Sequence, residues 1–273
     1  MRPLRTTRPS SWARTAPAAL AALAALAALT ACSSGGDQQS QPQPDQPGQP
    51  RALTVLAAAS LTEPYKELAA QFQAQHPGTQ VKFDFEGSST LVQQIKQGRK
   101  ADVFASADEK NMDKVVKEGL NAGPPQTFTT NKLTIAVPPG KGGDIHSFAD
   151  LAKPGRKVVV CAPQVPCGSA TQKVERATGA QLRPVSEEND VKSVLHKVTA
   201  GEADAGLVYV SDAKSAGAQV QSVDFPASGA AVNSYPEVTL KDAPQPQLAQ
   251  DWESFVQGPA GQAVLAQHGF GAK

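Results

Sequence analysis

From residue 53 onward, apolar and polar positions follow first a strand pattern and then a helix pattern. Residues 53–58 are an apolar run of strand length. The apolar positions after it recur at helical spacing, at Leu61, Tyr65, Leu68, Ala69 and Phe72. Strands at 81–85 and 101–106 each precede a further helix, near 91–98 and 111–118. Repeated strand–helix units predict an α/β fold, with an open parallel sheet covered by helices on both faces.

The pattern starts afresh after the turn at Pro138, Pro139 and Gly140. We expect strands at 131–137, 157–161, 205–210 and 235–240, and helices at 148–151, 170–177, 190–200, 251–256 and 261–267. The second half therefore predicts a second α/β lobe. We expect lobe 1 to comprise residues 51–130 and 241–273, and lobe 2 residues 131–240, with a cleft between them.

Two serines follow predicted strands and precede predicted helices. Ser60 begins an S-x-x-E capping box that ends at Glu63, and Ser88 follows Gly87 at the second joint. The first N–H groups of a helix have no intrahelical partner, so two such joints can present hydroxyl and N–H donors to one anion. Ordinary helix caps are the alternative interpretation. Ligands of open α/β sheets lie at the carboxyl ends of strands, which favours the anion site.

The first 50 residues have the composition of a targeting segment and a tether. Residues 1–31 combine four arginines with a short Ala/Leu stretch, typical of a signal peptide. The motif Leu-Thr-Ala before Cys32 resembles the lipobox of bacterial lipoproteins, which implies cleavage before Cys32 and lipid attachment to its sulfur. A plain signal peptide with a chance cysteine is the alternative. Residues 33–50 lack large apolar side chains, which predicts a disordered tether.

The net charge argues against a nucleic-acid partner, and the cysteine content predicts a disulfide. Residues 1–31 hold four of the 26 basic and none of the 25 acidic residues, so the remainder carries a net charge of −3. Without a basic stripe, nucleic acid is not an expected partner. Cys161 and Cys167 remain as a pair in an exported protein, which favours a disulfide over zinc because no further soft ligands lie nearby. We expect the disulfide to add about 2 kcal/mol of stability.

Motifs for catalysis or metal binding are missing. The sequence contains no G-x-S-x-G elbow, no H-E-x-x-H box and no P-loop, and its four histidines are scattered. An exported hydrolase with Ser60 or Ser88 as nucleophile stays a remote alternative. We therefore expect a binding protein, not an enzyme, without a cofactor and without direct metal ligands.

Several motifs, in the same order along the chain, resemble the molybdate-binding proteins of molybdate ABC importers. They are AAASLT at 57–62, GSSTL at 87–91, ADVFASAD at 101–108, VPCG at 165–168, NDV at 189–191 and GLVYVSD at 206–212. The resemblance implies the two-lobed periplasmic binding protein fold of type II, with the ligand in the cleft between the lobes. This sequence departs from the familiar pattern of that family at Cys161 and at Cys167. Alanine is common at the position of Cys167.

The resemblance also implies which residues bind the oxyanion. Ser60 and Ser88 would each donate a hydroxyl and a backbone N–H. Cys167, in a loop, and Val191, at a helix start, would donate backbone N–H groups, and Tyr209 its phenolic O–H. We further hypothesise that a Cys161–Cys167 bridge stiffens the loop that presents the Cys167 amide.

The resemblance implies a monomeric lipoprotein at the outer face of the cytoplasmic membrane. It would capture molybdate, and tungstate as well, and deliver it to an ABC permease. A binder of sulfate or another tetrahedral oxyanion is the nearest alternative, because the sequence does not give the size of the cleft.

Overall fold

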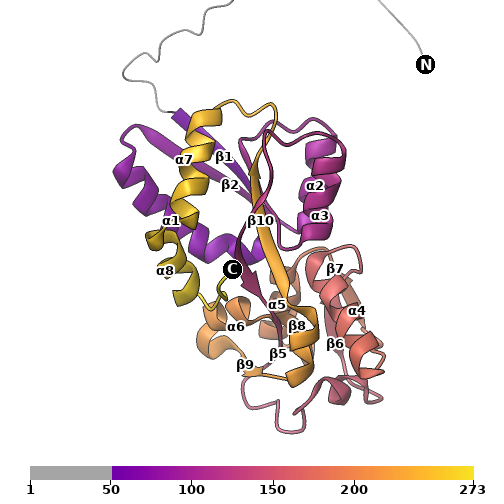
Figure 1. The fold of residues 1–273 in the computed structure, drawn as a ribbon. Helices are drawn as coiled ribbons and strands as arrows, with labels where there is room; N and C mark the ends of the chain where they lie inside the picture. The colour runs from indigo at the N-terminus through magenta and orange to yellow at the C-terminus, as the bar shows by residue number, and fades with distance from the viewer. Residues whose placement is uncertain (1–50) are drawn as a thin grey trace, which may run out of the picture. The chain divides into compact units, whose positions relative to one another are not determined.

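Two sheets of five strands organise the described part of the chain. The computed structural model describes residues 51–273, so the predicted signal segment, Cys32 and the tether lie outside the described residues. One sheet has the strand order β2-β1-β3-β10-β4 and the other β7-β6-β8-β5-β9. Each sheet with its helices forms one lobe, which we call lobe 1 and lobe 2 (Figure 1). The predicted two-lobed α/β fold is confirmed.

Lobe 1 is a sheet covered by helices on both faces. Its strands are β1 (Arg51–Ala58), β2 (Thr79–Glu86), β3 (Val103–Ala105), β4 (Gln126–Asn131) and β10 (Asn233–Thr239). Its helices are α1 (Thr62–Gln75), α2 (Ser88–Lys96), α3 (Glu109–Lys117), α7 (Pro246–Gln257) and α8 (Pro259–Gln267). Helices α1, α7 and α8 pack with Val55 on one face, and α2 and α3 pack with Leu56 on the other. Val55 and Leu56 are neighbours in β1 and therefore point to opposite faces of the sheet. Both are fully buried, because helices cover both faces.

Lobe 2 also has a five-stranded sheet, and its strands are shorter on average than those of lobe 1. Its strands are β5 (Leu133–Val137), β6 (Val158–Cys161), β7 (Ser186–Glu188), β8 (Ala205–Tyr209) and β9 (Gln221–Val223). Its helices are α4 (Pro166–Thr178), α5 (Val191–Thr199) and α6 (Val210–Ala216), with 3₁₀ turns η2 (Phe148–Ala152), η3 (Gly217–Gln219) and η4 (Pro226–Ala231). A single apolar cluster holds these elements together.

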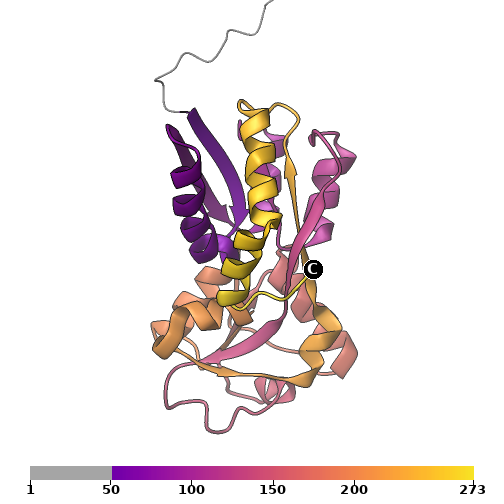
Figure 2. The same cartoon turned by 60° about the vertical axis from the view of Figure 1, so that its left-hand side comes forward.

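Both sheets are mixed, whereas the pattern predicted parallel sheets. Strands β1, β2 and β3 are parallel, but β10 runs antiparallel to β3 and β4. In lobe 2, β5 runs antiparallel to β8 and β9. The antiparallel strands are those near the passages between the lobes, where the chain enters lobe 2 through β4 and β5 and returns through β10 (Figures 1 and 2). Because β10 pairs in lobe 1, residues 233–239 lie in lobe 1 instead of at the end of lobe 2 as expected.

Two helix starts differ from the sequence expectation, and both affect the cleft. Ser60 does not cap a helix: it lies in a 3₁₀ turn, η1 (Ala59–Leu61), and α1 begins after it without a side-chain cap. The predicted capping box is therefore wrong, because the Ser60 hydroxyl bonds Tyr235 instead. Helix α4 begins at Pro166, four residues before the predicted helix, so Cys167 lies in a helical first turn and not in a loop.

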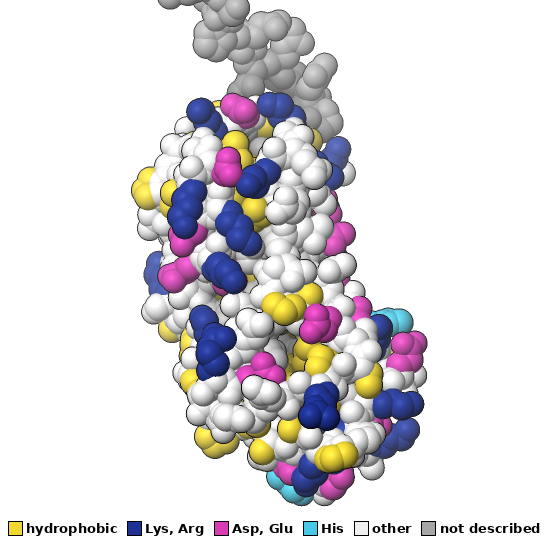
Figure 3. Space-filling model, turned by 90° about the vertical axis from the view of Figure 1, so that its right-hand side faces the viewer, with side chains coloured by type: hydrophobic (Ala, Val, Ile, Leu, Met, Phe, Trp, Pro, Cys, Tyr) yellow, Lys and Arg dark blue, Asp and Glu magenta, His cyan; other side chains and the backbone are white. Residues whose placement is uncertain are grey.

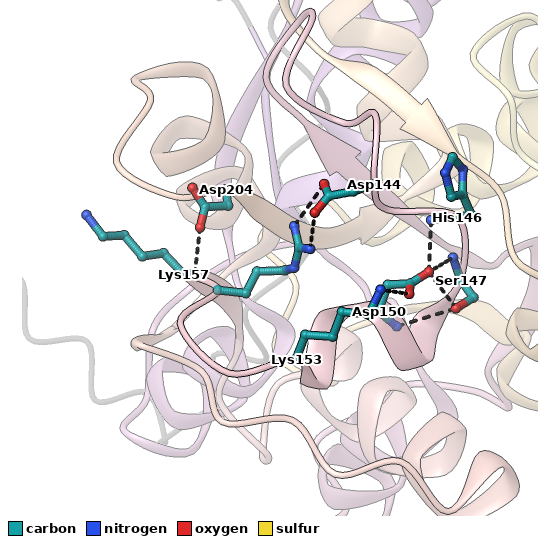
Figure 4. Close-up of polar contacts among 8 residues, drawn as sticks. Asp144, His146, Ser147, Asp150, Lys153, Lys157 and Asp204 are labelled. Atoms are coloured by element: carbon teal, nitrogen blue, oxygen red, sulfur yellow. Dashed lines mark hydrogen bonds and ion pairs between the residues drawn. The ribbon is translucent and has the colours of Figure 1, made fainter.

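Local polar contacts hold the connection between β5 and β6 (Figure 4). Ser147 and Asp150 form a capping box at the start of η2, and Asp150 also accepts a hydrogen bond from the backbone N–H of His146. Hydrogen bonds from Lys153, His146 and Ser147 hold the pKa of Asp150 below its usual range. The Arg156 guanidinium pairs with Asp144 beside them, 2.7 Å apart. His146 itself is exposed.

Charged side chains of both signs are distributed over the surface. On the face shown in Figure 3, basic and acidic side chains are interspersed over both lobes and form no continuous basic stripe. Among residues 51–273, no helix combines the length and the apolar character needed to span a bilayer.

Candidate anion-binding site

One small cavity between the lobes is lined by all five residues that the sequence analysis named. These are Ser60, Ser88, Cys167, Val191 and Tyr209. Each of them is at most 3% exposed. The cavity measures about 10 Å³, close to the space that holds one water molecule. Because its wall comes from both lobes, the room in this cavity depends on how closely the lobes approach each other.

The starts of three α-helices meet at this cavity. Ser88 is the first residue of α2, Cys167 the second of α4, and Val191 the first of α5. Asp190 is the N-cap residue of α5, and its carboxylate accepts from the backbone N–H of Ser193. Unpaired first-turn N–H groups and the positive ends of the helix dipoles favour a negatively charged ligand.

The hydroxyl of Ser88 is arranged to donate into the cavity. Its Oγ accepts a hydrogen bond from the backbone N–H of Ala107 over 3.0 Å. A serine hydroxyl has one hydrogen, and an oxygen that already accepts a bond keeps that hydrogen free. The Ser88 hydroxyl can therefore donate this hydrogen to an acceptor in the cavity.

Asn233 gives Tyr209 the same donor character. Its side-chain amide donates to the Tyr209 hydroxyl over 2.9 Å and to the carbonyl oxygen of Ala107 over 2.7 Å. Burial, followed by the nearby Tyr235 and Asp108, raises the pKa of Tyr209 well above its ordinary value. Tyr209 is thus a neutral phenol that accepts from Asn233 and can donate its own hydrogen to an acceptor.

Tyr235 is the corresponding partner of Ser60. The two hydroxyl oxygens lie 2.9 Å apart, and both residues are buried. Burial also raises the pKa of Tyr235, so its phenol stays protonated. When Tyr235 donates this bond, the Ser60 hydrogen is free to donate to a ligand.

A disulfide lies directly beside the cavity. Cys161, at the end of β6, is bonded to Cys167 in the first turn of α4, as the cysteine count predicted. It closes the short loop that leads into α4. The Thr171 hydroxyl donates to the carbonyl oxygen of Cys167, so the first turn of this helix is held from both sides.

An ionic contact joins the lobes next to the cavity. Lys192, in α5, lies 2.7 Å from Glu63 of lobe 1 and 3.4 Å from Asp212 of lobe 2. Burial acts to lower the pKa of Lys192, but the carboxylates of Asp212 and Glu63 outweigh this effect and raise it. Burial raises the pKa of Asp212 to about 6, even though Lys192 opposes the shift. The Asp212 carboxylate also accepts from the backbone N–H of Tyr209, which connects this network to the site.

Sequence reasoning missed several residues of the cavity and of its support. Glu86, Gly87 and Ala107 line the cavity from lobe 1, while Asn233 and Tyr235 support its donors from behind. Burial and the charges of Asp190 and Asp84 raise the pKa of Glu86. Glu86 and Gly87 had a sequence signal, since they directly precede Ser88. Asn233 and Tyr235 had none, because only the fold brings β10 to the cavity.

The donor set contains no metal site. Within residues 51–273, no group of three or more His, Cys, Asp or Glu side chains is placed to hold a metal ion. The five named residues offer hydroxyl and N–H donors, which suit an oxyanion and not a bare cation.

Comparison with known proteins agrees with this geometry. The bacterial extracellular solute-binding protein family matches residues 53–271. The chain belongs to this family. It is therefore a solute-binding protein and not an enzyme, as expected from the sequence.

Individual proteins that are similar to this chain extend the comparison. The chain is 51% identical over 220 residues to the molybdate-binding protein ModA of Mycobacterium tuberculosis, covering 81% of this chain and 84% of that relative. It is 32% identical over 231 residues to ModA of Escherichia coli, covering 81% and 89%. The solved periplasmic molybdate-binding protein of Azotobacter vinelandii matches with a TM-score of 0.72 at 27% identity, over 81% of this chain and 99% of that one. The resemblance found in the sequence is confirmed.

Proposed function

We propose that this protein captures molybdate, and tungstate in the same site, outside the cytoplasmic membrane and delivers it to an ABC permease. The observation that carries the proposal is the meeting of three helix N-termini and three buried hydroxyl groups at one interlobe cavity. The names of the relatives at 51% and 32% identity support the choice of ligand.

The proposed ligand contacts are all made by neutral donors. Ser60 and Ser88 donate hydroxyl and backbone hydrogens, Cys167 and Val191 donate backbone hydrogens, and Tyr209 donates its phenolic hydrogen. Such donors stabilise a dianion in a dry cleft without a counter-ion. They also allow release, since the ligand itself forms no ion pair with the protein that has to be broken when the lobes separate.

Opening and closing of the lobes is part of the proposed mechanism. The ion pair between Lys192 and Glu63 and the small cavity describe a closed arrangement. A tetrahedral oxyanion enters when the lobes part, and closure then brings donors from both lobes onto its oxygens. The closed form would be the one that docks on the permease.

The cellular placement follows from the same proposal. Members of the family are extracellular, and we propose that lipid on Cys32 anchors this protein as a monomer to the outer face of the membrane. Residues 33–50 would act as the tether. No cofactor is required for binding.

Calorimetric titration tests the choice of ligand. The described part of the chain, residues 51–273, can be titrated with molybdate, tungstate, sulfate and phosphate in turn. We expect one-to-one binding of molybdate and tungstate, with sulfate and phosphate silent. Tight binding of sulfate or phosphate instead would overturn the molybdate assignment and keep the class of ligand. Absence of heat with all four anions would refute the anion site.

A further inference from the structure

Gly87 lines the cavity and lies directly against the backbone of lobe 2. It precedes α2, and the three atoms nearest to a Cβ built on it all belong to lobe 2. Such a Cβ would lie 2.0 Å from the carbonyl oxygen of Asn189 and 3.6 Å from a methyl carbon of Val165. Carbon–oxygen contacts in proteins are about 3.3 Å or longer. In this closed arrangement, position 87 has no room for any side chain.

The glycine is needed for space and not for backbone conformation. Gly87 has φ −61° and ψ 136°, which every L-amino acid adopts without strain. In this it differs from glycines such as Gly78 and Gly98, which have positive φ angles and open space around them. Lobe 1 on its own would therefore accept a side chain at position 87, and the clash would arise only when the lobes close.

We propose that Gly87 determines how far the lobes close and thereby sets the affinity for the ligand. This proposal rests on the proposed function. A Cβ at position 87 would keep Asn189 about 1 Å further from lobe 1 to restore an ordinary contact. Val191 follows Asn189 by two residues, so the N-terminus of α5 would move with it.

The displacement acts on the proposed ligand contacts of lobe 2. Hydrogen bonds of about 2.9 Å that lengthen by about 1 Å exceed the range in which they contribute. The interlobe ion pair of Lys192 and Glu63, now 2.7 Å, would be stretched at the same time. A single methyl group at position 87 would thus weaken the ligand hydrogen bonds of lobe 2 and the interlobe ion pair without taking part in either.

Two substitutions at position 87 and one control test the proposal. Gly87→Ala adds only the Cβ. Gly87→Ser adds the same Cβ with a side chain that favours the N-cap position, which protects against loss of the α2 cap. Gly258→Ser is the control, because Gly258 is also an N-cap glycine, with φ −74° and ψ 171°. Its nearest contacts, at 3.2 and 3.4 Å, lie within lobe 1.

Affinity, closure and apo stability are then measured on the same variants. We expect both Gly87 variants to bind molybdate about tenfold to a hundredfold more weakly, as for the loss of one hydrogen bond to a charged group. Gly258→Ser should bind as the wild type does. Spin labels at the exposed positions 117 and 173, one in each lobe, should show a longer interlobe distance in the ligand-bound Gly87 variants than in the wild type. Melting of the ligand-free variants should change by only a few degrees.

Three results would overturn the proposal. Wild-type affinity in both Gly87 variants would show that closure does not depend on this contact. An unchanged interlobe distance would do the same. A large loss of apo stability in both variants would assign Gly87 to the folding of lobe 1 instead. If the wild type bound none of the anions, the proposed function would fail, and the label distances of wild type and variants alone would decide the role of Gly87.

Discussion

The two lobes contribute to the same cavity in different chemical ways. Lobe 1 provides side-chain hydroxyls, Ser60 and Ser88, each with a fixed hydrogen-bond partner behind it. Lobe 2 provides the N-termini of α4 and α5 and a single hydroxyl, that of Tyr209. Two of the donors proposed for lobe 1 thus depend on the identity of a side chain and are accompanied by the backbone N–H groups of the same serines, whereas most lobe 2 donors depend on the position of the backbone.

Their cores differ in a matching way. Lobe 1 contains a buried aromatic cluster around Trp252, in contact with Tyr65, Phe72 and Phe83. The cluster of lobe 2 is mainly Val, Ala and Leu, and a disulfide supports its cavity-facing loop. A lobe that presents backbone donors needs its loop held in place, and in lobe 2 a covalent bond provides this. The difference between the lobes can be tested in their cores and in their ligand donors, beginning with the largest expected effect.

Truncation of Trp252 should cause the largest loss of stability. Trp252→Ala removes a fully buried indole, and we expect the free energy of unfolding to fall by about 3–5 kcal/mol. Trp252→Phe is the control, because the indole N–H has no hydrogen-bond partner within the described residues, so a smaller aromatic ring forfeits no bond there. Denaturant unfolding measures both variants. Equal losses would show that volume at this position matters little.

Removal of the Ser88 hydroxyl should cause the largest loss of affinity among single donors. Ser88→Ala deletes a hydrogen bond to a charged ligand, worth about 1.5–3 kcal/mol, so molybdate should bind about tenfold to a hundredfold more weakly. Val191→Ala keeps the backbone N–H and should have a much smaller effect. Calorimetry compares the two. A larger effect from Val191→Ala would contradict the division between side-chain and backbone donors.

Loss of the disulfide should affect stability and binding together. The double variant Cys161→Ala, Cys167→Ala should lower the free energy of unfolding by about 2 kcal/mol, because the short loop becomes free in the unfolded chain. Affinity should also fall, although every backbone donor remains, since α4 is held less firmly. Reduction of the wild type should reproduce both changes and leave the double variant unaffected. Unchanged affinity would limit the disulfide to a stabilising role.

Glu237 should make lobe 1 less stable as the pH rises. It is fully buried, and burial together with Glu253 raises its pKa well above 4.5. The folded state therefore holds the proton more tightly, and stability declines as the pH rises from 4.5 toward the folded pKa. Glu237→Gln keeps an acceptor for the Tyr65 hydroxyl, which now donates to Glu237 over 3.1 Å. We expect the variant to be more stable by about 1–3 kcal/mol at pH 8 and equal to the wild type near pH 4. Thermal melting across this range decides, and a stabilisation independent of pH would contradict the titration of Glu237.

The interlobe ion pair should have the smallest effect. Glu63→Gln removes the 2.7 Å contact with Lys192, which is partly exposed, so affinity should fall by a few-fold, or about 0.5–1 kcal/mol. Added salt should reduce the difference from the wild type. Glu67→Gln is the matched control, because Glu67 lies in the same helix and pairs with His268 within lobe 1. An equal loss in both variants would refute a specific role in closure.

The sequence predicted the larger elements because their patterns are local. Helix α1 and strand β2 are long enough to show clear periodicity, and the structure confirms both. The short strands β7 and β9, of three residues each, and the seven-residue helix α6 were missed, since so few residues carry no periodic signal. The pairing of Cys161 with Cys167 was predicted from the cysteine count, the expected export of the protein and the lack of further zinc ligands nearby.

By itself, the sequence determined the two α/β halves, the cysteine pair and the five residues that the family resemblance placed in the site. Only the tertiary structure decided which side chains orient them. Ser60 takes Tyr235 as its partner across 175 residues of sequence, and Asn233 reaches both Tyr209 and Ala107. The need for a bare backbone at Gly87 also emerged only there, because Asn189 approaches it from the other lobe. Spacing and periodicity describe neighbours along the chain, whereas these contacts depend on how two lobes come together.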